Sequence, residues 1–140
     1  MGLITVITGP PCSGKTTYAR QHAKPGDLII DFDEIAQALG SPSTHEHPPH
    51  IREVTAAAWA QAIRRAIELR KPAWIIDSRP KPDRMERYRA ARATIVPLSA
   101  TADILHQRAT DAGRPVIVHK QIDEWFTRPR TAQPTSRIRW

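Results

Sequence analysis

The stretch Gly9-Pro10-Pro11-Cys12-Ser13-Gly14-Lys15-Thr16 matches the G-x-x-x-x-G-K-S/T pattern of a phosphate-binding loop. A loop that cradles phosphates must curl its backbone N–H groups inward, and glycine tolerates the dihedral angles that this curl requires. The two prolines have no N–H to donate, so the available donors begin at Cys12 and lead into the first turn of a helix. The predicted contacts to a nucleoside triphosphate are Gly9, Cys12, Ser13, Gly14, Lys15, Thr16 and Thr17.

Two side chains at the end of the loop would act on the phosphates themselves. Lys15 is placed to reach the β- and γ-phosphates, and the Thr16 hydroxyl is placed to bind Mg²⁺. The flanking sequence supports this assignment, because residues 3–8 form a β-branched apolar run typical of a buried parallel strand and residues 17–23 can continue as a helix. Strand, glycine loop and helix is the order that such a loop needs.

Carboxylates end two later strand-like runs. Residues 28–33 read as a second strand that ends in Asp31 and Asp33, and residues 73–78 as a third strand that reaches Asp77. The carboxyl ends of parallel strands face one crevice, so these carboxylates should lie beside the phosphate loop. There Asp33 would accept the proton of an attacking hydroxyl, Asp31 would hold a magnesium-bound water or orient the acceptor, and Asp77 would stand beside Mg²⁺. The alternatives are that Asp33 only caps the following helix and that Asp77 only starts a turn.

The rest of the chain completes an α/β pattern. Residues 51–70 form the clearest amphipathic helix, in which Trp59 is expected in the core or at its rim. We expect further helices over 34–39, 83–92, 101–108 and 122–126, and a fourth strand over 93–98. The pattern predicts a single α/β domain over residues 1–126, with a parallel sheet of about four to five strands flanked by helices and a small lid over residues 108–120.

Composition indicates the kind of partner. Lys and Arg outnumber Asp and Glu by 21 to 14, which gives a net charge of +7. This excess favours a polyanion, such as a nucleotide or nucleic acid, although a merely basic soluble protein fits it too. The single cysteine, Cys12, excludes an intramolecular disulfide, and no signal-peptide pattern or membrane-length apolar run is seen, so we expect a cytoplasmic protein. Residues 127–140 form a basic, proline-containing tail that we expect to be extended or poorly ordered.

Residues 41–50 form a proline-rich polar connector that contains His45, His47 and His50. Three histidines this close suggest a metal site, but no cysteine accompanies them and the prolines favour an exposed loop. Two interpretations of the connector therefore stay open, a mobile loop near the acceptor pocket and a plain linker.

From residue 3 to about residue 125 the sequence resembles the P-loop kinases, and among them the phage and bacterial polynucleotide 5′-hydroxyl kinase domains. The loop over 9–16 is the specific part of the resemblance, while Asp33 falls where that family has its general base and Asp77 matches a carboxylate at the end of its third strand. The resemblance implies a P-loop NTPase-type fold, ATP with Mg²⁺ as the phosphate donor and an alcohol as the acceptor.

The sequence departs from this family at two places. An arginine stands three residues beyond the general base in the family and would contact a phosphate of the acceptor, but Ala36 occupies that position here, so the contact would fall to Arg79 or another arginine. The arginine of the lid is also out of the family's register, and Arg108 or Arg114 would take its place. Such an arginine stabilises the charge on the transferring phosphoryl group.

Three functions remain open at this stage. The first is an ATP-dependent kinase that phosphorylates a hydroxyl of a nucleotide or nucleic acid. The second is a small-metabolite or nucleoside kinase, because the Asp31-x-Asp33 pattern also resembles the acceptor site of small P-loop kinases that act on polyols or shikimate-like acids. The third is a non-catalytic module that binds ATP or GTP and uses its basic charge to contact nucleic acid.

Overall fold

A four-stranded parallel sheet forms the centre of the computed structural model, which describes residues 3–127. The strand order is β2-β3-β1-β4, and each neighbouring pair is parallel. This confirms the α/β fold with a parallel sheet flanked by helices. The strands are β1 (Ile4–Thr8), β2 (Leu28–Ile30), β3 (Ala73–Ile76) and β4 (Thr94–Pro97).

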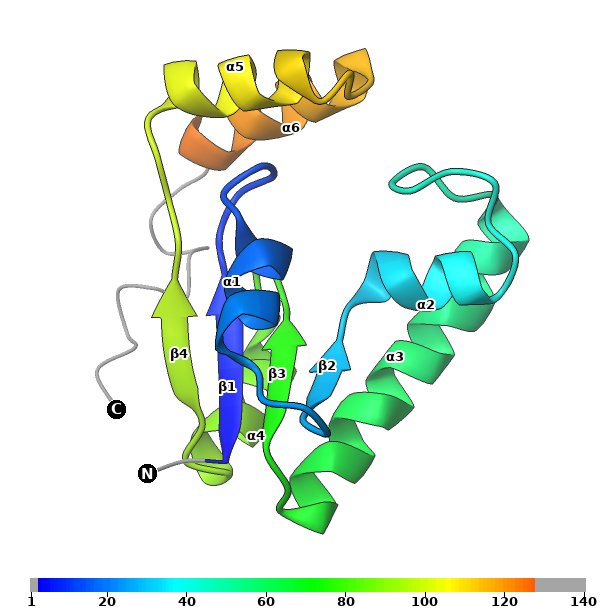
Figure 1. Cartoon of the computed structure of the whole chain (residues 1–140), viewed down its shortest axis with the longest axis vertical. Coiled ribbons are helices and arrows are strands. Elements are labelled where there is room, and N and C mark those ends of the chain that lie inside the picture. The colour runs from blue at the N-terminus through cyan, green and yellow to red at the C-terminus, as the bar shows by residue number, and fades with distance from the viewer. Residues whose placement is uncertain (1–2, 128–140) are drawn as a thin grey trace.

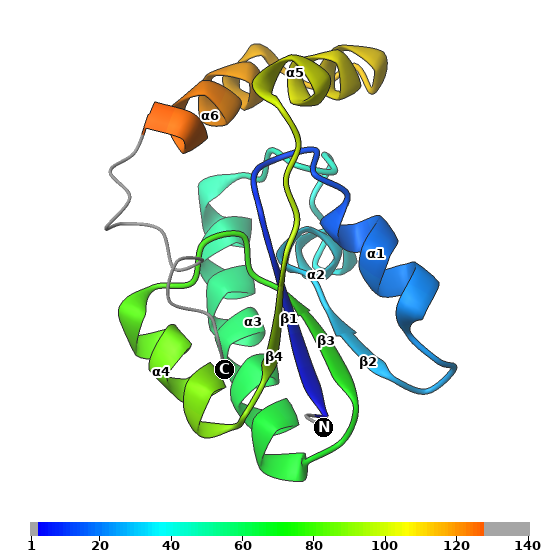
Figure 2. The same ribbon diagram turned by 90° about the vertical axis from the view of Figure 1, so that its left-hand side faces the viewer.

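Helices lie on both faces of the sheet and beyond its carboxyl edge. Helix α1 covers one face, α3 and α4 cover the other, and α5 and α6 form a pair above the carboxyl ends of the strands (Figures 1 and 2). The helices are α1 (Lys15–His22), α2 (Phe32–Ala38), α3 (Pro49–Leu69), α4 (Pro82–Ala90), α5 (Ala102–Asp111) and α6 (Val116–Thr127).

The main core lies between the sheet and the helices α3 and α4. Val6 and Ile75 from the two central strands are fully buried there and pack with Ile63 of α3 and Tyr88 of α4. Strands that are covered on both faces need apolar side chains on both, which explains the continuous apolar runs in the sequence. Trp59 is 9% exposed and belongs to this core, as its place on the amphipathic helix predicts.

Helices α2 and α6 begin earlier than the sequence pattern indicates, each for its own reason. Helix α2 starts at Phe32 because the Asp31 carboxylate accepts a hydrogen bond from the Asp33 N–H, so the N-cap is Asp31 and the expectation that Asp33 caps this helix is wrong. Helix α6 starts at Val116, within a β-branched run that has low helix propensity. Packing against α5 overrides that propensity.

Helices α5 and α6 pack on each other as a helical hairpin with a small core of its own. Leu105 and Ala109 of α5 meet Val118 and Ile122 of α6, and all four side chains are buried. The predicted lid over residues 108–120 falls within this hairpin. Ile122 therefore packs on α5 rather than on the sheet, and the predicted tail lies outside the described residues from 128 onward. Among the described helices, none is long and apolar enough to cross a membrane.

Candidate active site

The phosphate loop is tied to the ends of the two strands that flank it. The N–H of Gly9 donates to the carbonyl of Ser78, which follows β3, and the N–H of Leu98, which follows β4, donates to the carbonyl of Thr8. Gly9 has a φ of 145°, and a Cβ at this position would lie 2.3 Å from the Leu98 carbonyl oxygen. Only glycine fits here, because the segment after β4 passes so close to the loop. This close approach explains the first glycine of the motif.

The curl of the loop continues through two further residues with positive φ. Cys12 has a φ of 65°, which the sequence did not indicate, and Gly14 has a φ of 92°. Gly14 is the N-cap of α1 and no side chain caps this helix, so the N–H groups of the first turn remain open to an anion. The Ser13 hydroxyl is buried and has no hydrogen-bond partner among the described residues. The open amides and the unpartnered Ser13 hydroxyl could all donate hydrogen bonds to the oxygens of a phosphate group.

The Lys15 side chain folds back over the loop that carries it. Its Nζ donates to the carbonyl oxygens of Gly9 at 2.9 Å and Pro10 at 2.7 Å. Burial of the ammonium group lowers the pKa of Lys15 from 10.5 to about 8, because the charged form loses hydration there. A triphosphate would offer this group a stronger, charged partner than two carbonyls.

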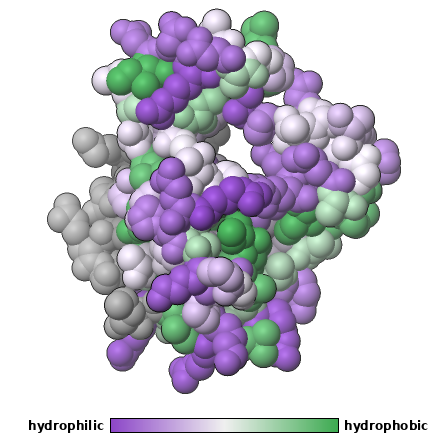
Figure 3. Space-filling model, in the orientation of Figure 1, coloured by the Kyte–Doolittle hydropathy of each residue, from purple (hydrophilic) through white to green (hydrophobic). Residues whose placement is uncertain are grey.

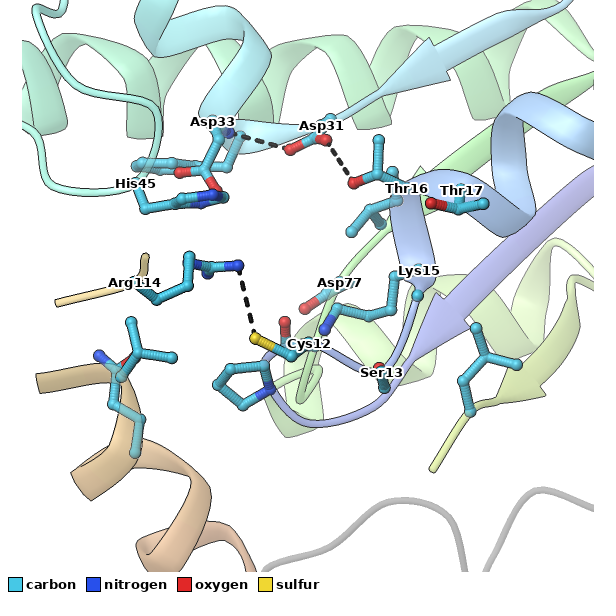
Figure 4. Close-up of a pocket in the computed structure, with 18 of the residues that line it drawn as sticks. Cys12, Ser13, Lys15, Thr16, Thr17, Asp31, Asp33, His45, Asp77 and Arg114 are labelled. Carbon is cyan, nitrogen blue, oxygen red and sulfur yellow. Dashed lines mark hydrogen bonds and ion pairs between the residues drawn. The ribbon is translucent and has the colours of Figure 1, made fainter. Parts of the chain in front are cut away.

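Asp31 joins the phosphate loop to the end of β2. Its Oδ2 accepts a hydrogen bond from the Thr16 hydroxyl at 2.9 Å, while its Oδ1 accepts from the backbone N–H of Asp33 at 3.0 Å (Figure 4). Asp31 is 6% exposed. The hydroxyl that the motif assigns to Mg²⁺ and a carboxylate are therefore direct neighbours, and oxygen donors of these kinds are what Mg²⁺ prefers.

Asp77 lies at the same sheet edge but its carboxylate has protein partners. Arg84 donates to both oxygens, through Nε at 2.8 Å and Nη2 at 3.3 Å, and the Tyr88 hydroxyl donates at 2.9 Å. Burial and the nearby Asp77 charge raise the pKa of Tyr88. These bonds anchor α4 to the end of β3, and Asp31 rather than Asp77 is the carboxylate bonded to Thr16. A metal role for Asp77 stays a prediction.

Asp33 stands at the start of α2 with its carboxylate 36% exposed, between two histidines of the following loop. His47 Nε2 lies 2.7 Å from Oδ1, and His45 Nδ1 lies 3.1 Å from Oδ2. The sequence left residues 41–50 open as a mobile loop near the acceptor pocket or a plain linker, and in the structure two histidines of this segment contact Asp33. Within residues 3–127 no group of three or more His, Cys, Asp or Glu side chains is arranged to hold a metal ion.

Three arginines connect the helical hairpin with the loop and the sheet. Arg108 donates through Nη1 to the Cys12 carbonyl at 3.0 Å, and Arg114 Nη1 lies 3.5 Å from the Cys12 sulfur. Arg79 extends from the other side, where its guanidinium lies 3.9 Å from the centre of the Trp125 ring and donates to the Trp125 carbonyl at 3.5 Å. Both candidates for the lid arginine thus reach the phosphate loop.

A single open cavity of about 1480 Å³ brings these groups together. It is visible as a hollow between the helical hairpin, the loop before α3 and the sheet (Figure 3). Of the residues predicted from the sequence, Gly9 alone lies outside the lining. Those that line it are Cys12, Ser13, Gly14, Lys15, Thr16, Thr17, Asp31, Asp33, Asp77, Arg79, Arg108 and Arg114.

Further residues line the cavity to which the sequence had assigned no catalytic, metal or substrate role. His45 and His47 arrive from the loop before α3, and Arg52 comes from the first turns of α3. The position of residues 41–50 after Asp33 was the signal that could place these histidines near the acceptor, since a proline-rich loop shows no periodicity. Ala36, which stands where the resemblance leads one to expect an arginine, is fully buried.

Comparison with known proteins identifies the family and the fold of the chain. A family model described as an AAA domain matches residues 4–129. No curated protein matches the chain. The structure of a tunicamycin resistance protein from Deinococcus radiodurans superposes with a TM-score of 0.52 at 20% sequence identity, over 96% of this chain and 84% of that one, which is a likeness of fold. Since the family model spans most of the sequence, the chain belongs to this AAA domain family of P-loop, kinase-like proteins.

Proposed function

We propose that the protein is a kinase that transfers the γ-phosphate of MgATP to a hydroxyl group. The observation that carries this proposal is a series of two hydrogen bonds, from the Thr16 hydroxyl to Asp31 and from the Asp33 N–H to Asp31. They connect the phosphate loop with Asp33, whose carboxylate lines the cavity. A site that only bound nucleotide would not need a cavity-facing carboxylate beyond the metal position. In a kinase that carboxylate is the base for the acceptor.

Each part of the site has a defined task in this reaction. MgATP would supply the electrophilic γ-phosphorus, with Mg²⁺ neutralising charge on the phosphates. The open amides of the loop and Lys15 would hold the β- and γ-phosphates, and Thr16 with Asp31 would form the metal side of the site. Arg108 and Arg114 would stabilise the charge that spreads over the transferring phosphoryl group.

Asp33 would act on the acceptor. One carboxylate oxygen takes the proton of the acceptor hydroxyl as the new oxygen–phosphorus bond forms and the bond between the γ-phosphorus and its bridging oxygen breaks, which releases ADP. The proton then leaves Asp33 to solvent, because the carboxylate is 36% exposed. Proton removal by a positioned base contributes typically about 10²- to 10⁴-fold in rate.

The acceptor is best sought among nucleotides and nucleic acids. The net charge of +7 and two cavity-lining arginines, Arg52 and Arg79, favour a substrate that carries phosphate. The buried Ala36 favours the alternative, a small hydroxylated metabolite, because it removes the acceptor-phosphate contact of polynucleotide kinases.

Phosphate transfer from labelled ATP to a panel of nucleosides, oligonucleotides and polyols tests the proposal. Lys15→Ala should abolish transfer and weaken triphosphate affinity, whereas Asp33→Asn should retain nucleotide affinity and lose transfer by a factor of about 10² or more. Lys24→Ala and Asp103→Asn are matched controls, since neither residue lines the cavity. Normal turnover by Lys15→Ala, or a wild-type protein that binds ATP and phosphorylates nothing in the panel, would contradict the kinase assignment.

A further inference from the structure

The loop over residues 41–48, here called the histidine loop, holds the Asp33 carboxylate in place. His47 is its anchor: the side chain is 2% exposed, with Nε2 at 2.7 Å from Asp33 Oδ1 and Nδ1 at 2.6 Å from the Ser41 hydroxyl. The Phe32 ring lies 6.2 Å away, centre to centre. A histidine buried with a partner on each ring nitrogen has one orientation available.

The direction of these hydrogen bonds follows from the groups involved. A carboxylate can only accept, so the His47 Nε2 carries the hydrogen and donates it to Asp33. The His47 Nδ1 lies 2.6 Å from the Ser41 hydroxyl oxygen, and the single hydrogen of that hydroxyl can go either to Nδ1 or to the Ser43 carbonyl oxygen at 3.2 Å. This relay of contacts from Ser41 through His47 to Oδ1 fixes both the orientation of the histidine ring and the rotation of the carboxylate.

His45 contacts the other oxygen in a different setting. Its side chain is 35% exposed, and its Nδ1 lies 3.1 Å from Asp33 Oδ2. His45 and Asp33 both line the cavity and lie side by side in Figure 4. A hydroxyl that approaches Asp33 from the cavity therefore meets His45. One oxygen of the carboxylate is held by a buried group and the other by a partly exposed group.

We propose that the two histidines have separate roles in the transfer, an inference that rests on the function proposed above. His47 is a positioning residue that holds Oδ1 so that Oδ2 points to the acceptor. His45 contacts the acceptor directly: the incoming hydroxyl takes its place at Oδ2, and the displaced ring binds the neighbouring part of the acceptor. The hydroxyl proton passes to Oδ2, and the His47 N–H stays on Oδ1 throughout.

The kinetic constants of single variants separate these roles. His47→Ala should lower kcat on the order of ten- to hundredfold with the acceptor KM within about threefold, because a misplaced base slows proton transfer without removing an acceptor contact. His47→Gln keeps an N–H donor toward Oδ1 and should restore most of that loss. His45→Ala should instead raise the acceptor KM by about tenfold or more, the loss of roughly one hydrogen bond to substrate.

Controls keep loop damage apart from these effects. His50→Ala removes an exposed histidine that does not line the cavity and should leave both constants unchanged. Nucleotide affinity should be the same in all variants, since no residue of the histidine loop is among the predicted triphosphate contacts. A kcat loss in His47→Gln as large as in His47→Ala, or the same kinetic signature for His45→Ala and His47→Ala, would overturn the proposal.

A second measurement does not depend on turnover. The His47 ring N–H, buried and bonded to a carboxylate, should give a solvent-protected proton resonance in the free protein that Asp33→Ala abolishes and His50→Ala retains. Absence of this resonance in the wild type refutes the relay itself. If the resonance is present but no acceptor is phosphorylated, the kinase assignment fails while the arrangement of His47 on Asp33 stands.

Discussion

The Lys15 side chain is held by the loop in a position where its ammonium group loses hydration. Its ammonium group is turned onto the carbonyls of Gly9 and Pro10, and loss of hydration lowers its pKa to about 8. The free protein thus tolerates the charge poorly, while a bound triphosphate would restore it. The energetic cost of desolvating the lysine is then offset by the ligand, which couples binding to proton uptake.

This coupling predicts a pH dependence of nucleotide affinity. The free protein loses the Lys15 proton as the pH rises through about 8, whereas the bound state favours the charged form, so affinity should fall by about tenfold between pH 7 and pH 9. Calorimetry with a non-hydrolysable ATP analogue, in two buffers of different ionisation enthalpy, measures both the affinity and the proton uptake. Lys15→Arg stays charged over this range and should show no such dependence, and a flat profile in the wild type would rule the coupling out.

At the scale of elements, the helical hairpin of α5 and α6 is a unit that meets the phosphate loop through arginines. Its four-residue core is separate from the core of the sheet, and Cys12 and Ala100 pack against it. Arg108 comes from a helix and Arg114 from the turn after Gly113, which has a φ of 64°. The two side chains therefore reach the same loop residue from a helix and from a turn.

The two arginines should separate in a kinetic comparison. One of the two arginines should contact the transferring phosphoryl group. Its substitution by alanine should lower kcat by about 10³-fold and leave nucleotide affinity nearly unchanged. The other should mainly alter nucleotide affinity through its contact with Cys12. Single-turnover rates and analogue binding for Arg108→Ala and Arg114→Ala identify each role, with Arg92→Ala, outside the cavity, as the control. Two variants with normal kcat would exclude both from the reaction.

For the whole molecule, charge is the property that separates the two proposed acceptors, a nucleotide or nucleic acid and a small metabolite. The net charge of +7 is that of the entire chain, and part of it lies beyond the described residues. A cluster of cations attracts a polyphosphate at a distance, and 0.1 M salt screens that attraction at separations beyond about 10 Å. A neutral metabolite would not respond to the same field.

Salt dependence of the acceptor KM therefore distinguishes the candidates. An oligonucleotide that makes about three phosphate contacts should show a KM that rises roughly twentyfold between 50 and 200 mM salt, because bound counterions are released on binding. The same series with a nucleoside acceptor serves as the control and should change little. A salt-independent oligonucleotide KM would speak against electrostatic recognition of the acceptor and favour the metabolite alternative.

The sequence by itself determined the phosphate loop, the parallel α/β sheet and the set of carboxylates at its edge. These follow from local patterns: the glycine spacing specifies the curl, apolar runs specify buried strands, and parallel strands bring their carboxyl ends to one side. That is why nine residues predicted from these patterns, from Cys12 to Asp77, line one cavity, while Arg79, Arg108 and Arg114 in the same lining came from the family resemblance.

Only the tertiary structure decided which groups pair with one another. Asp31 bonds Thr16 while Asp77 bonds Arg84 and Tyr88, and nothing in the local sequence distinguishes these carboxylates. His47 reaches Asp33 across 14 residues and Arg114 reaches Cys12 across 102. Such contacts depend on how helices and loops pack over long separations, and packing is a property of the assembled molecule rather than of any stretch of its sequence.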